Sequence, residues 1–164
     1  MSSIGIDRIR VEFRVAQHHL RDFVEKCAPA GLDREVPGDG RSVRQVAAHC
    51  IDGWQMVIDG FNAVQTGQPM PAFDGPAVDA RNAADALRTA QFTREHTLAA
   101  MEAVAAQVEN ILGFLTDDVL EAPGPATLRG EQSVGEVLRQ TLVFHVDEHL
   151  AALIALEDDA FATA

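Results

Sequence analysis

The sequence is poor in cysteine, with only Cys27 and Cys50 among 164 residues. Two cysteines are too few for a disulfide framework, and their scarcity suits a reducing cytosol. Long apolar runs are also missing, since no stretch reaches the roughly 18 residues of a transmembrane helix. The first ten residues lack the charged-then-apolar order of a signal peptide. We therefore expect a cytoplasmic protein that does not span a membrane.

Basic residues are scarce too. The chain has 13 Lys and Arg against 25 Asp and Glu, which gives a formal net charge of −12. A protein that follows a phosphate backbone needs a basic face, so this balance argues against a nucleic-acid partner. It argues equally against an anionic membrane surface. We expect neither partner, and we interpret the acidic surface as a source of solubility.

The length and apolar content are those of one globular domain. A chain of 164 residues is long enough to bury close to 70% of its unfolded surface, so folding requires neither a disulfide nor a metal. The apolar fraction of 47% is ordinary. We expect residues 1–164 to form a single domain.

Apolar residues recur at steps of three and four in four segments, which predicts four amphipathic helices. These helices are expected over residues 6–27, 43–65, 79–115 and 134–157. Ser42 with Gln45, and Ser133 with Glu136, form capping-box patterns before the second and fourth helices. No segment alternates with period two, so no sheet is expected. The predicted fold class is all-α, a four-helix bundle.

The stripes also assign core positions. Leu87 and Met101 belong to the apolar stripe of the third expected helix, and Leu138 and Ala152 to the buried face of the fourth. Two connections, residues 66–78 and 116–132, are long and rich in Pro and Gly. Connections of this length often cross over a bundle or cover a site.

His145 and His149 are four residues apart, so they share one side of the fourth helix, within the arc of its apolar residues. A buried polar group without a partner costs about 1–3 kcal/mol. Two neighbouring buried imidazoles therefore need a shared explanation. A divalent metal ion supplies one. The alternative is that each imidazole bonds a carbonyl or carboxylate of the core.

His49, on the flank of the second helix, is the candidate for a third ligand. It shares a strip with Gly53 and Gly60, whose missing side chains would admit a neighbouring helix or ligand. His49 lies about 10 Å from the start of its helix and His149 about 12 Å from the end of its own. If these two helices are antiparallel, His49 and His149 lie at the same height along the bundle. If the helices are parallel, the two heights differ by about 8–13 Å.

The topology of the bundle decides whether the second and fourth helices are antiparallel or parallel. A simple up-down-up-down bundle makes the second and fourth helices parallel, whereas an up-down-down-up order makes them antiparallel. The second order needs a long crossover between helices 2 and 3. The chain has a linker of roughly 13 residues there, able to span about 40 Å when extended.

Two blocks of the sequence resemble the DinB-like proteins, which are metal-binding helical bundles. RSVRQVAAHCIDGW, residues 41–54, resembles their second helix, and QSVGEVLRQTLVFHVDEHLAALIAL, residues 132–156, their fourth. The resemblance implies an up-down-down-up bundle with the long crossover between helices 2 and 3, and often a homodimer. It also implies one divalent metal ion, held by His49, His145 and His149.

The resemblance extends to function. Relatives include thiol S-transferases that use mycothiol or bacillithiol, and the metal domain of a mycothiol-dependent maleylpyruvate isomerase. His145 stands where that isomerase has glutamate, which argues against the isomerase reaction. We therefore expect a metal-dependent S-transferase that joins a low-molecular-weight thiol to an electrophile. Three imidazoles suit zinc, nickel or iron.

Two alternatives remain open at this point. The first is a non-catalytic, metal-binding stress-response bundle with a structural ion, whose fourth position Cys50 or Glu148 would fill. The second is a protease-like site, because residues 145–149 fit the pattern H-x-x-E-H with Glu148 as general base. Three protein ligands favour an open position, and therefore chemistry, over a closed structural site.

Overall fold

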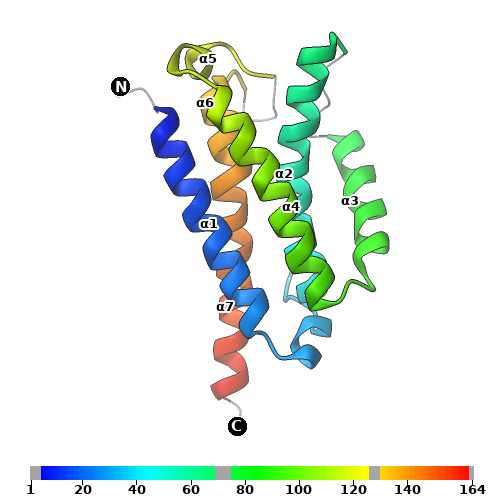
Figure 1. The fold of residues 1–164 in the computed structure, drawn as a ribbon. Helices are drawn as coiled ribbons and strands as arrows, with labels where there is room; N and C mark the ends of the chain where they lie inside the picture. Colours follow the sequence, from blue (N-terminus) through cyan, green and yellow to red (C-terminus); the bar gives the residue numbers. More distant parts are fainter. Residues whose placement is uncertain (1–4, 69–74, 126–129, 163–164) are drawn as a thin grey trace.

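The structure, a computed structural model, describes residues 5–68, 75–125 and 130–162, the last six of these by their backbone alone. Four long helices pack into a bundle, with shorter helices in the connections (Figure 1). The described part contains no strand, and the all-α fold class is confirmed. In chain order the elements are α1 (Ile6–Lys26), the 3₁₀ turn η1 (Pro29–Asp33), α2 (Val43–Thr66), α3 (Pro76–Thr89), α4 (Arg94–Phe114), α5 (Asp117–Glu121), α6 (Val134–Arg139), the π-helical segment η2 (Gln140–Phe144) and α7 (His145–Ala162).

The chain directions follow from Figure 1. α1 and the continuous helix formed by α6, η2 and α7 run from one end of the bundle to the other, while α2 and α4 run in the opposite sense. α7 is therefore antiparallel to α2. The sequence located the crossover within residues 66–78, but α3 makes the return along α2. Residues 69–74 of that linker lie outside the described part.

The third expected helix, residues 79–115, is in fact two helices. α3 ends at Thr89, and α4 begins after Thr93, whose hydroxyl accepts a hydrogen bond from the backbone N–H of His96 at 3.2 Å. This cap starts a new helix in a new direction. Leu87 is consequently 81% exposed, against expectation, while Met101 is buried as predicted.

Ionic and amide contacts hold α3 against α2. Arg81 donates two hydrogen bonds of 2.8 Å to the buried carboxylate of Asp52 and one of 3.0 Å to Asp59. The Gln45 amide donates to the backbone oxygen of Ala86 at 2.7 Å. With α3 on one side and α4 and α7 on others, α2 is buried almost all round and not along a single stripe.

A widened turn interrupts the C-terminal helix just before His145. The π-helical segment Gln140–Phe144 shifts the register of the residues that follow by one position, so Ala152 is exposed while Leu153 is buried. The indole N–H of Trp54 donates to the backbone oxygen of Leu142 at 3.2 Å and ties this turn to α2. The expected burial of Ala152 was wrong for this reason.

Both predicted capping boxes are confirmed. Ser42 and Gln45 bond each other reciprocally before α2, and Ser133 and Glu136 do so before α6. The apolar stripe of α1 is buried throughout. No helix in the described ranges combines the length and apolarity needed to cross a bilayer.

The contacts of Asp52 predict how α3 is attached. Asp52→Ala leaves Arg81 without its main partner, and we expect the free energy of unfolding to fall by about 1–3 kcal/mol. Asp59→Ala removes the more exposed carboxylate on the same arginine and should cost less. Chemical denaturation gives both values, and hydrogen exchange should quicken over residues 76–89 in Asp52→Ala only. Equal losses, or unchanged exchange in α3, would contradict this role of Asp52.

Candidate metal centre

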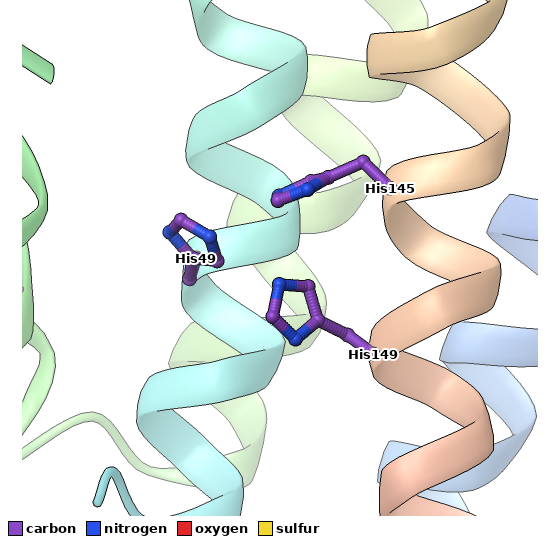
Figure 2. A group of neighbouring side chains, drawn as sticks. All are labelled: His49, His145 and His149. Carbon is purple, nitrogen blue, oxygen red and sulfur yellow. The ribbon is translucent and has the colours of Figure 1, made fainter. Parts of the chain in front are cut away.

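Three imidazoles meet between α2 and α7. His49 lies on α2, and His145 and His149 lie one turn apart on α7 (Figure 2). The ring centroids are 4.8 Å apart for His49 and His145, 5.0 Å for His49 and His149, and 4.7 Å for the pair on α7. One possible ligand atom from each lies within 4.8 Å of those of the other two. The structure thus brings together the three residues that the sequence singled out.

Gly53, one turn after His49, makes room for the cluster. A Cβ atom at Gly53 would lie 3.2 Å from Cδ2 of His145, closer than most real contacts allow. The suggestion that this glycine admits a neighbouring group is therefore confirmed. Gly60, farther along the same side of α2, instead lines an apolar pocket of about 230 Å³ together with Val57 and, from α6, Leu138.

The three imidazoles lack internal hydrogen-bond partners. Within the described residues, none of them bonds a backbone carbonyl or a carboxylate. The nearest acidic atom is Oδ2 of Asp39, which lies 3.9 Å from Nδ1 of His149 and so beyond hydrogen-bonding distance. The described residues therefore place no core acceptor within hydrogen-bonding distance of these three histidines.

All three are held in the neutral form. Burial is the main cause that lowers the pKa of His49 to about 3, with a further contribution from the Arg41 guanidinium. Burial, followed by the neighbouring His149, lowers the pKa of His145 to about 4. Burial also lowers the pKa of His149. Neutral imidazole is the form that binds divalent metals, so the cluster is ready to act as a donor set at pH 7.

The donor set fits a divalent ion. Tetrahedral zinc with bonds of about 2.0–2.1 Å to imidazole needs nitrogens about 3.3 Å apart. The rings already converge (Figure 2), and their possible ligand atoms lie within 4.8 Å of one another, so binding an ion needs these atoms to approach by up to about 1.5 Å. Each histidine is only partly buried, so the cluster can be reached from outside. The three residues could hold one ion and leave a coordination position for another molecule.

The proposed fourth ligands do not join the cluster. Cys50 is fully buried in the core, and burial raises the pKa of its thiol to about 12. Glu148 is exposed on α7 and is not part of the histidine group. Neither residue therefore closes the site, and the general-base role for Glu148 receives no support.

Two neighbours of the cluster had no role in the sequence reasoning. Asp39 and Arg41 precede α2 and form a two-bonded ion pair, with contacts of 2.5 and 2.8 Å. Their side chains are mostly buried. Gly38 and Gly40 beside Asp39 both have φ of 77°. These glycines, with Pro37 before them, were the signal in the sequence that a specific turn lies there.

Comparisons with known proteins agree with the fold that carries this cluster. The sequence model of the DinB superfamily matches residues 12–153. No protein with a curated description matches the sequence significantly. Among solved structures, the sibling lethal factor precursor DfsB is similar with a TM-score of 0.81 and 11% identity, over 97% of this chain and 98% of that one. A mycothiol-dependent maleylpyruvate isomerase gives a TM-score of 0.74 and 13% identity, over 93% of this chain and 63% of that one.

A further relative corrects one expectation. The colibactin self-resistance protein ClbS has a TM-score of 0.77 and 12% identity, over 96% of this chain and 98% of its own, and was solved in complex with double-stranded DNA. The prediction of no nucleic-acid partner is therefore wrong as an inference from net charge. Net charge is a sum over the whole chain, whereas contacts to phosphates depend on where individual arginines lie.

The lowered histidine pKa values predict a pH-dependent stability of the metal-free protein. The folded pKa lies below the unfolded value of about 6.5, so the unfolded state binds more protons as pH falls below that value. The free energy of unfolding should thus fall between pH 7.5 and 5, by about 1–2 kcal/mol for His145. Urea denaturation in the presence of a chelator measures it.

His145→Asn provides the control, because asparagine does not titrate in this range. The variant should show a shallower slope of stability against pH than the unaltered protein. The exposed residues His18, His19 and His96 are retained in both proteins and do not affect the comparison. Identical slopes would show that His145 does not resist protonation in the folded state.

Proposed function

The chain belongs to the DinB superfamily, and from that premise we propose that His49, His145 and His149 bind one divalent metal ion in a metal-dependent thiol S-transferase. The enzyme would join a low-molecular-weight thiol to an electrophile. One observation carries the proposal: three neutral, partly accessible imidazoles converge without internal hydrogen-bond partners. Zinc or nickel suits this donor set best, and iron also fits.

The ion would supply Lewis acidity, which lowers the pKa of a thiol at its open position from about 8.5. The histidines contribute by remaining neutral. Because the folded protein opposes their protonation, protons do not compete with the ion near pH 7. Their neutrality also leaves the positive charge of the ion uncompensated by its ligands. The site is therefore suited to stabilising a thiolate.

Neither cysteine of the chain is suited to act as the nucleophile. Cys50 is fully buried, and its raised pKa keeps the thiol protonated. Cys27 is also buried and lies at the end of α1. A thiol from outside therefore has to supply the sulfur. A cytosolic thiol of the mycothiol or bacillithiol class agrees with membership of the DinB superfamily and with the proposed cytoplasmic location.

The apolar pocket beside α2 is suited to the electrophile. Val57, Gly60 and Val64 follow Gly53 along α2 at helical spacing, so the pocket lies on the C-terminal half of the helix that carries His49. Its lining is almost wholly apolar, which favours an electrophile with an uncharged carbon skeleton.

Membership of the DinB superfamily also leads us to propose that the protein is a homodimer. Analytical ultracentrifugation would test this proposal.

Removal of a ligand tests the site. We expect His145→Ala to abolish stoichiometric binding of zinc or nickel, measured by elemental analysis after dialysis. Transfer activity, followed as loss of the free thiol, should disappear with the metal. His96→Ala changes an exposed histidine on α4 and should alter neither result. Full metal retention in His145→Ala would refute the assignment.

Metal removal distinguishes an enzyme from a bundle with a structural ion. The apolar core is complete without the ion, so the chelated protein should keep its helical circular dichroism while losing thiol transfer. Returning the metal should restore activity. If chelation unfolds the protein, and no thiol accelerates loss of any tested electrophile, the structural alternative is correct.

The space at Gly53 gives a second test. Gly53→Ala places a methyl group 3.2 Å from the His145 ring and should turn that ring, weakening metal binding roughly tenfold. Gly113→Ala adds the same group to α4, where nothing lies within 4 Å, and should leave metal binding unchanged. Isothermal titration with zinc measures both. Equal affinities in the two variants would show that His145 needs no room from Gly53.

A further inference from the structure

A tight turn leads from η1 into α2 and is closed by backbone hydrogen bonds. The N–H of Val36 donates to the oxygen of Arg41 at 2.8 Å, and that of Val43 donates to Arg34 at 2.9 Å. Val36 is buried in the core and anchors the turn. Gly38 and Gly40 provide the left-handed backbone that the reversal requires. The turn thus holds the residues between them in a defined position.

Asp39 and Arg41 project from this turn toward the histidine cluster. The Arg41 guanidinium donates to both oxygens of Asp39, at 2.5 and 2.8 Å, and lowers the pKa of that carboxyl group. Oδ2 of Asp39, one of those two oxygens, lies 3.9 Å from Nδ1 of His149. A carboxylate held by an arginine therefore faces one nitrogen of a proposed metal ligand.

We propose that Asp39 is a positioning residue for the metal centre: it accepts a hydrogen bond from Nδ1–H of His149 and leaves Nε2 to bind the ion. Arg41 fixes the carboxylate for this purpose. The inference rests on the proposed metal site. It extends that site beyond its three ligands to the turn before α2.

The chemistry of metal-bound histidine supports this assignment. An imidazole that binds through one nitrogen donates its other N–H, commonly to a carboxylate, and this bond fixes both tautomer and ring orientation. Asp39 faces Nδ1, so Nε2 is the nitrogen available to an ion. Closing 3.9 Å to about 2.8 Å needs a movement of roughly 1 Å, which rotation of the ring can supply.

The charge of Arg41 complicates a simple substitution. Asp39→Ala removes the acceptor and also leaves an unpaired guanidinium close to all three imidazoles, where it would repel a cation. Replacing both residues avoids this effect. In Asp39→Ala/Arg41→Gln the local net charge equals that of the original pair, so a remaining loss of affinity reports on orientation.

Co²⁺ is the probe, because its visible absorption reports both binding and ligand geometry. Its affinity would be titrated in the unaltered protein, Asp39→Ala, Asp39→Asn and the double variant, with helical content checked by circular dichroism. Glu35→Gln removes a negative charge from an exposed position in the same turn and is the matched control. His149→Ala reports loss of a ligand.

We expect affinity for Co²⁺ to fall by about 10–100-fold in Asp39→Ala and in the double variant, with an altered visible spectrum. Asp39→Asn keeps an acceptor oxygen but leaves the Arg41 charge unpaired, so its affinity should lie between those of Asp39→Ala and the unaltered protein, while Glu35→Gln should match the unaltered protein. If the double variant binds as the unaltered protein does, Asp39 only offsets Arg41 and the inference is wrong. If the unaltered protein binds no Co²⁺, the proposed metal site itself fails.

Discussion

The antiparallel packing of α7 against α2 is the constraint on which the rest of the site depends. It places His49 at the height of His145 and His149, and it removes all three rings from most of the solvent. Burial then lowers their pKa values and leaves them neutral. The contact is possible because Gly53 has no side chain at the point where the His145 ring passes α2. The packing of α7 against α2 is therefore the common reason why the three rings meet, why they stay neutral and why they can act as donors to a metal.

The sequence predicted those features that local patterns encode. Both capping boxes and the α1 stripe were predictable because each depends on residues within a turn or two. The break between α3 and α4 was missed, although Thr93 carried a capping signal. The covering of α2 by α3 was not predictable, because it rests on the pair Asp52–Arg81, whose partners are 29 residues apart. A contact between residues so far apart produces no repeating pattern in the sequence.

The histidine cluster could be predicted, whereas its surroundings could not. Two histidines on an apolar face contradict the helical pattern, and that local conflict pointed to them. Asp39 lies in a loop, where a carboxylate is ordinary, and its importance appears only when the turn folds against α7. The π-helical segment before His145 is similar, since its support comes from Trp54 on another helix.

The net charge of the whole chain is a poor guide to the charge at a particular site. On α1, Arg14 and Arg21 pair with carboxylates of α4, so these cations are neutralised locally. At the cluster the three imidazoles are uncharged, and the charges of Asp39 and Arg41 cancel each other. A divalent ion there would keep its full charge and would be the largest charge in its surroundings. A chain of net charge −12 can therefore present a locally cationic point, and an anionic sulfur would be drawn to it.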